Sequence, residues 1–234
     1  MIAILIIIGI GVLVIFRDDW KKCVYFLIFM VPFFGFIQLK ILHLTPLAPL
    51  IHDITIILPM YLLFILTRIK KRDIQFYLPS YFRNFLLFFI VVIIVFTINP
   101  FYETNFLVKL VGVKVWIFYL LFISIGFEFL ESELELKKFC NFFAIIVIIP
   151  CVIGILQYLG SYFIGYRETM TTFFAGNRIL ANMSTQGFST FNWGSGVIIF
   201  RLPSTFSFAG QFNVFLICAF IPALVSVGLS KTNK

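Results

Sequence analysis

The chain has 234 residues, of which 62% are hydrophobic and 12% are charged, and its mean hydropathy is +1.08. No water-soluble fold can bury this much apolar surface, so the composition excludes an ordinary soluble enzyme or binding domain. The formal net charge of +8 would suit nucleic acid, but the basic residues stand at the ends of apolar runs and lack the interleaved aromatic residues of a nucleic-acid groove. The composition therefore predicts a membrane protein and no nucleic-acid partner.

Seven apolar runs take up most of the chain, and each has roughly the length of a membrane-spanning helix. They lie at 2–16, 23–39, 54–67, 81–98, 115–129, 139–159 and 212–229. The first run is short for a span, and Pro32 is expected to kink the second. The predicted fold is all-α: one polytopic membrane domain over 1–234 with about seven transmembrane helices.

The connections between the runs differ in charge and in length. The connection at 68–72 is the densest basic cluster of the chain, whereas 131–138 has the composition of a polar helical link. The connection at 160–211 is about fifty residues long and rich in Gly, Ser, Thr, Asn and aromatic residues. It is longer than an incidental connection, and we expect one long loop there.

The distribution of basic residues predicts the orientation in the membrane. If the 68–72 cluster is cytoplasmic, twelve Lys and Arg residues fall on the inner side and six on the outer side. Because basic loops stay in the cytoplasm, this asymmetry predicts that the N-terminus lies outside and the C-terminus inside. The loop at 160–211 is then on the outer face.

Motifs for soluble enzyme chemistry are absent from the sequence. It contains no phosphate loop, no HExxH zinc motif and no nucleophile elbow. The four cysteines lie in or beside apolar runs, without CxxC or Cys/His pairing. No metal and no cofactor are therefore expected.

A polar stretch that begins at Arg201 leads into the last apolar run. It reads Arg-Leu-Pro-Ser-Thr-Phe over 201–206 and follows the long outer loop. In this position it resembles the integral-membrane O-antigen ligase and polymerase superfamily, and 114–119, which opens the fifth run, resembles a recurrent element of that group. The resemblance covers roughly residues 100–230.

The resemblance implies chemistry on undecaprenyl-diphosphate-linked glycans at the outer face, without a nucleotide sugar or a metal. Members of the superfamily usually have more spans than this chain, so it also implies an N-terminal portion that needs a C-terminal portion or a partner subunit. Either ligation or polymerisation of the glycan fits the resemblance.

Candidate site residues follow from this chemistry and from the predicted outer side. Arginine offers a planar fork of donors that suits phosphate oxygens, and a carboxylate or imidazole can remove the acceptor proton. The candidate catalytic residues are Arg201, Glu168 and His52, and the candidate substrate-binding residues are Arg178, Arg167 and Lys114. Asp53 and Glu103 are further candidates for the base.

Each candidate base also has a structural interpretation. His52 and Asp53 would cap or anchor the third helix, and Glu168 with Arg167 would form a surface pair that contributes little to stability.

A secondary transporter or flippase-like permease is the alternative function. The sequence shows no internal repeat, and the centres of the apolar runs hold almost no ionisable residues, which disfavours transport. A scaffold without chemistry is a third interpretation.

Overall fold

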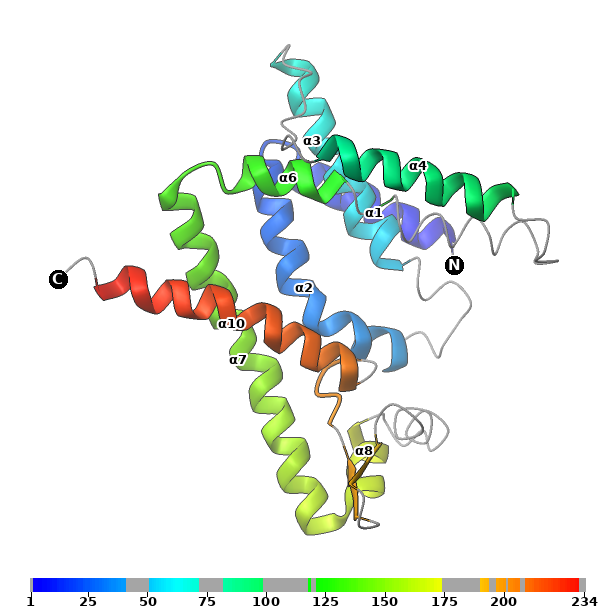
Figure 1. Cartoon of the computed structure of the whole chain (residues 1–234), viewed down its shortest axis with the longest axis vertical. Helices are drawn as coiled ribbons and strands as arrows, with labels where there is room; N and C mark the ends of the chain where they lie inside the picture. Colours follow the sequence, from blue (N-terminus) through cyan, green and yellow to red (C-terminus); the bar gives the residue numbers. More distant parts are fainter. Residues whose placement is uncertain are drawn as a thin grey trace. The chain divides into compact units, whose positions relative to one another are not determined.

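The structure, a computed structural model, consists mainly of helices and includes one short β-hairpin (Figure 1). It describes residues 2–40, 51–71, 82–98, 118, 121–173, 190–193, 197–200, 202–206 and 209–231. The chain divides into two compact units. Unit 1 comprises Met1–Leu63 and Leu136–Lys234, and unit 2 comprises Phe64–Glu135.

Helices occur in both units, and the two strands lie in unit 1. In chain order they are α1 (Ile2–Ile15), α2 (Trp20–Lys40), the π-helical turn η2 (Asp53–Ile57), α3 (Leu58–Lys70), α4 (Phe82–Ile98), α6 (Leu121–Phe129), α7 (Glu133–Ile164), α8 (Tyr166–Phe173), β1 (Thr190–Trp193), β2 (Val197–Phe200) and α10 (Ala209–Lys231). Each of the seven apolar runs overlaps at least one of these helices. The prediction of a helical chain is confirmed for the described residues.

Among the described residues, two helices are long and apolar enough to cross a membrane, by length and composition. They are Glu133–Ile164 and Gly210–Gly228, and the shorter apolar helices are Ala3–Ile15 and Leu86–Val95. In the 18-residue apolar stretch of Glu133–Ile164 only 22% is buried, and in that of Gly210–Gly228 only 11%. Helices in the core of a soluble protein would be largely covered, so this exposure fits membrane association. The count of seven spans stays a prediction.

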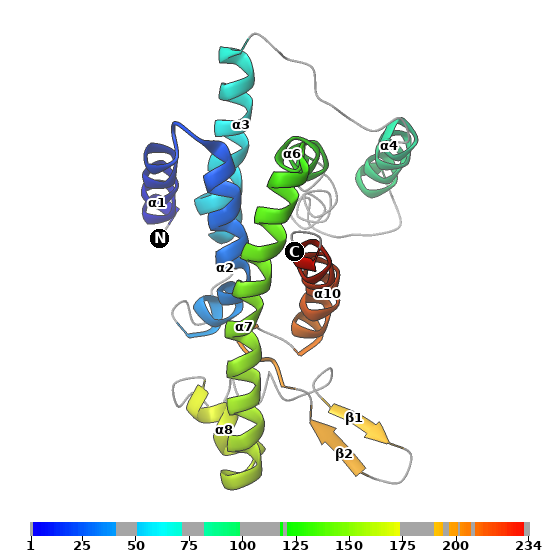
Figure 2. The ribbon, with the colours of Figure 1, turned by 90° about the vertical axis from the view of Figure 1, so that its left-hand side faces the viewer.

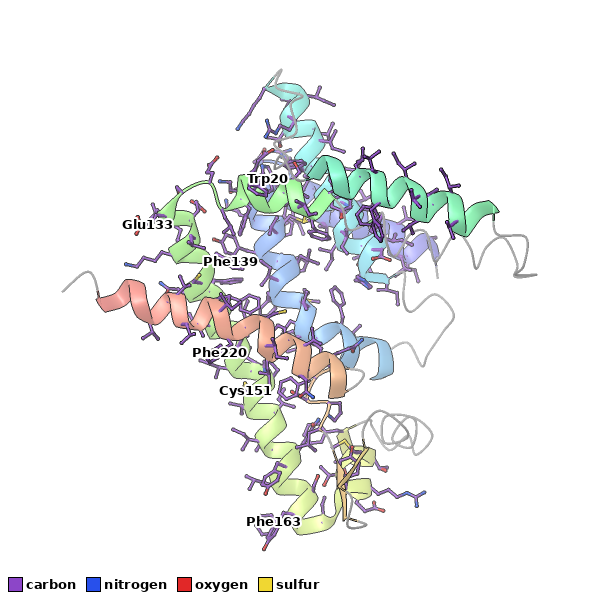
Figure 3. The ribbon with its side chains drawn as sticks, viewed as in Figure 1. Trp20, Glu133, Phe139, Cys151, Phe163 and Phe220 are labelled. Carbon is purple, nitrogen blue, oxygen red and sulfur yellow. The ribbon has the colours of Figure 1, made fainter. Side chains whose placement is uncertain are left out.

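The surface of α10, and that of α7 beyond its charged first turns, is largely apolar. Figure 3 shows the side chains of Cys151 and Phe163 on α7 and of Phe220 on α10. The exposed apolar side chains of α10 include Val214, Ile217, Phe220, Ile221, Leu224 and Val227. A surface of this kind is stable against lipid tails and unfavourable against water.

The region from 160 to 211 departs from the prediction of a single loop. Helix α7 continues to Ile164, and α8 follows it directly. Strands β1 and β2 pair antiparallel, with Thr190 opposite Phe200 and Trp193 opposite Val197. The all-α class holds for the described residues apart from this hairpin. Its two short segments are rich in β-branched and aromatic residues, which favour strands.

Local signals explain both ends of α7. Ser132 Oγ accepts a hydrogen bond from the Glu135 N–H at 3.2 Å, as in a capping box, and Glu133 and Glu135 stand in the first turn. At the other end Gly165 has φ +89°, a left-handed conformation that commonly ends a helix. The polar link predicted at 131–138 is thus mostly the first turns of α7.

Helix packing within unit 1 includes a close backbone approach. A Cβ added at Gly9 of α1 would lie 2.8 Å from the Ile54 carbonyl oxygen, whereas one at Gly11 would meet nothing within 4 Å. Small residues allow such contact between membrane helices. Gly9 therefore lets α1 pack directly on η2.

Helix α7 contacts both α2 and α10 in unit 1. Helices α2 and α7 lie side by side (Figure 2), and the rings of Tyr25 on α2 and Phe142 on α7 are 4.9 Å apart. Ser226 Oγ and Asn141 Oδ1 lie 2.5 Å apart, which joins α10 to α7. Helix α7 thus has one neighbour in α2 and another in α10.

Candidate functional site

Three of the six candidate site residues lie outside the described residues. These are Arg201, Arg178 and Lys114. Arg167 and Glu168 lie on α8, and His52 lies directly before η2.

Helix α8 presents Arg167 and Glu168 on an exposed surface. Both side chains lie in its first turn, where the positive end of the helix dipole favours the carboxylate. Within the part of the chain that the structure describes, neither side chain forms an ion pair. The predicted surface pair is therefore absent there, and both side chains are exposed.

The buried face of α8 packs on the last turns of α7 (Figure 2). Thr169 and Met170 are buried, and the Thr169 hydroxyl donates to the Gly165 carbonyl at 2.9 Å. A Cβ added at Gly160 would lie 2.9 Å from Thr169 Cγ2. This close packing fixes α8, and with it Glu168, at the end of α7.

Tyr166 is a further titratable group on α8. Burial raises the pKa of Tyr166 to about 12, because the phenolate would lose its hydration. The phenol thus stays protonated at neutral pH and cannot act as a base. Glu168 is left as the acid–base candidate of this helix.

His52 lies against a buried carboxylate and an aromatic ring. Its Nε2 is 3.1 Å from Asp53 Oδ1, and its ring centroid is 5.2 Å from that of Phe34 on α2. The Asp53 side chain is 4% exposed. His52 makes no side-chain capping bond to η2, so these contacts favour the interpretation that His52 and Asp53 anchor the third helix against α2.

Three buried hydrogen bonds join α7 to residues 202–206, which we name the Ser204 turn. Gln157 Nε2 donates to the Ser204 carbonyl at 2.9 Å, and the Ser204 N–H donates to Gln157 Oε1 at 2.9 Å. The Ser204 hydroxyl donates to the Pro150 carbonyl at 2.5 Å. Gln157 is fully buried and Ser204 is 5% exposed. One amide side chain thus satisfies both backbone groups of Ser204.

Local sequence explains why the Ser204 turn fits on α7. Ser204 has φ +54°, which is rare outside glycine, and the Phe206 N–H donates to the Pro203 carbonyl at 3.0 Å to close the turn. A Cβ at Gly154 would lie 3.3 Å from Phe212 Cε1 and 3.8 Å, an ordinary contact distance, from Ser204 Cβ, so the glycine leaves room for the Phe212 ring beside the turn. A non-glycine residue in the left-handed region is held there by its surroundings. The hydrogen bonds to α7 provide that restraint.

Aromatic rings hold the same turn against α10. The Phe206 ring lies 5.9 Å from that of Phe212 and 5.1 Å from that of Phe215, and Phe206 is 6% exposed. The Ser204 turn is therefore fixed on one side by hydrogen bonds to α7 and on the other by ring packing on α10.

Gln157 and Ser204 are structural residues that the sequence analysis missed. Gln157 is one of two amide residues in the run 139–159, the other being Asn141, so the sequence does not single it out. Its partner lies 47 positions away, so the sequence alone does not identify the contact.

The side chains of the described residues lack the grouping that a metal site requires. Within it, no group of three His, Cys, Asp or Glu side chains is placed to hold a metal ion. Comparison of the chain with protein-family models, with curated proteins and with solved structures gives no match.

Proposed function

We propose that this chain is a membrane protein of bacterial surface polysaccharide synthesis. It would transfer or polymerise glycans from a lipid diphosphate carrier at the outer face of the inner membrane. The observation that carries this proposal is the Ser204 turn, which is held on α7 by three buried hydrogen bonds. Arg201 precedes Ser204 by three residues, so the contact restrains the chain next to this candidate phosphate ligand.

The direction of the helix contacts supports a multi-pass arrangement. Asn141 near the start of α7 contacts Ser226 near the end of α10. Phe212 near the start of α10 would touch a Cβ at Gly154, in the second half of α7, at 3.3 Å. The two helices thus run in opposite senses, as successive crossings of a membrane do.

The proposed orientation in the membrane rests on the excess of basic residues on the predicted inner side. Lys137 and Lys138 lie at the start of α7 and belong to the twelve inner basic residues. The other end of α7, with α8 and the Ser204 turn, would then face the outside. The N-terminus would be outside and the C-terminus in the cytoplasm.

The proposed reaction is attack by an acceptor hydroxyl on the anomeric carbon of the lipid-linked sugar. The new glycosidic bond forms while the bond to the diphosphate breaks, and the diphosphate leaves with the electron pair. Arg201, with Arg178, Arg167 and Lys114, would stabilise the charge on the leaving diphosphate. Glu168 or His52 would take the acceptor proton, and no cofactor takes part.

The test of this proposal is the Arg201→Ala variant in a host that depends on the protein for its surface polysaccharide. The host also supplies any C-terminal portion or partner subunit. We expect lipid-linked glycan to accumulate and long-chain polysaccharide to disappear, whereas Arg201→Lys retains part of the activity. Arg17→Ala is the control, because the Arg17 side chain is 74% exposed on a predicted inner connection.

Normal polysaccharide chain length in the Arg201→Ala strain, at equal protein level, contradicts the proposal. Uptake of a small solute into proteoliposomes, with unchanged lipid-linked glycans, favours the permease.

A further inference from the structure

A buried ion pair joins two helices of unit 2. The Arg68 guanidinium on α3 contacts Glu128 Oε1 on α6. The Arg68 side chain is 10% exposed and that of Glu128 is 15% exposed. Both charged groups are thus largely withdrawn from solvent.

An aromatic ring completes the surroundings of Arg68. Its Cζ atom lies 5.9 Å from the ring centroid of Phe64, a residue that is fully buried. The face of an aromatic ring attracts a guanidinium ion. Arg68 therefore has two attractive partners inside unit 2.

The neighbours of Arg68 in the basic cluster behave differently. Ile69, Lys70 and Lys71 are exposed, and Arg68 is the buried one among the described residues of the cluster. The sequence predicts that the whole 68–72 cluster serves as positive-inside charge. Arg68 instead makes a specific contact between helices.

The helix ends show why Glu128 needs this partner. Glu128 lies in the last turn of α6, where the partial negative charge of the helix end disfavours a carboxylate. Ser124, one turn earlier on the same helix, is also buried, and its hydroxyl has no hydrogen-bond partner among the described residues. The guanidinium of Arg68 is thus the charge that offsets Glu128.

We propose that Arg68 and Glu128 form an assembly lock, which holds the C-terminal ends of α3 and α6 at the same face of the membrane. Arg68 lies in the last turn of α3, so the pair joins the two C-terminal ends. Between them the chain includes α4, whose 17 residues span about 25 Å. A return crossing through α4 would bring α6 back in the direction of α3.

The test is a charge exchange. We expect Arg68→Glu and Glu128→Arg each to lower the folded, protease-resistant fraction in membranes by about tenfold or more. The double variant, with both substitutions, regains most of that fraction, because the attraction is restored. Lys70→Glu is the matched control, since it makes the same charge change at an exposed position of the same cluster.

Either of two outcomes of this charge exchange would contradict the proposed role of the Arg68–Glu128 pair. One is a double variant that folds no better than the worse single variant. The other is an Arg68→Glu variant that folds as well as Lys70→Glu.

A cross-link gives a second measurement in case the charge variants all fail to fold. Removing both members of a buried ion pair is better tolerated than removing one, so the variant Arg68→Cys/Glu128→Cys should assemble. With a protease site inserted between the two cysteines, its fragments stay joined until a reductant is added. Fragments that separate without reductant contradict the lock.

Discussion

The Ser204 turn and the Arg68–Glu128 pair both place polar groups among apolar helices, but they differ in how these groups are satisfied. At the Ser204 turn, neutral groups exchange three hydrogen bonds of 2.5 to 2.9 Å. In the ion pair, two opposite charges balance each other. Neutral partners leave a moderate penalty when one is removed, whereas a buried charge left without its partner is strongly unfavourable.

The largest effect is therefore expected at the ion pair. Arg68→Met should lower the free energy of unfolding by about 3 kcal/mol, because it leaves the Glu128 carboxylate uncompensated at the end of α6. Denaturant titration in detergent micelles measures this change. The double variant Arg68→Met/Glu128→Leu should recover most of the loss. A double variant as unstable as the single one would show that the uncompensated Glu128 carboxylate is not the cause.

A smaller loss is expected when the Ser204 turn loses its amide partner. Gln157→Leu removes both hydrogen bonds to the Ser204 backbone and should lower the free energy of unfolding by about 2 kcal/mol. Gln211→Leu is the control, since Gln211 is exposed on α10. Equal effects of the two glutamine substitutions would show that the hydrogen bonds to the Ser204 turn contribute no stability.

Substitution of a glycine by alanine is expected to have different effects beside the Ser204 turn and on α6, the helix of Glu128. Gly154→Ala would bring a Cβ to 3.3 Å from Phe212 Cε1, beneath the Ser204 turn, and should destabilise by about 1 kcal/mol. Gly126→Ala on α6, the helix of Glu128, meets nothing within 4 Å and should be neutral or stabilising. Thermal unfolding of the two variants in the same detergent tests this difference, and the opposite order would contradict it.

An effect of similar size is expected from the left-handed backbone of Ser204. Ser204→Ala and Ser204→Gly both remove the hydroxyl that bonds to the Pro150 carbonyl. Alanine keeps the unfavourable φ of +54°, whereas glycine adopts it without strain. The glycine variant should therefore be about 1 kcal/mol more stable than the alanine variant, and equal stabilities in a denaturant titration would exclude strain at this residue.

The helical part of the fold follows from the sequence because its signals are local. Apolar runs mark the helices, and the capping box at Ser132 with Glu135 would have placed the start of α7 correctly. The hairpin also had a local signal, since Gly194-Ser195-Gly196 separates two short segments that favour strands. Composition alone made that region look like a loop.

The polar contacts did not follow from the sequence, because their partners are distant along the chain. Gln157 and Ser204 are 47 positions apart, and nothing near Gln157 distinguishes it from a residue that faces lipid headgroups. Arg68 looked like one member of a basic cluster, although Glu128 pairs with it from another helix. Such pairings depend on tertiary packing, which short motifs do not encode.

Membrane sidedness is the most direct test of the whole account, since the proposed chemistry requires α8 and the Ser204 turn to face outward. Glu168→Cys and Lys71→Cys each place a thiol at an exposed position, and the parent chain gives the background. In intact spheroplasts, a membrane-impermeant maleimide should label position 168 at once and position 71 only after permeabilisation. Labelling of position 71 in intact cells, with position 168 protected, would contradict the account.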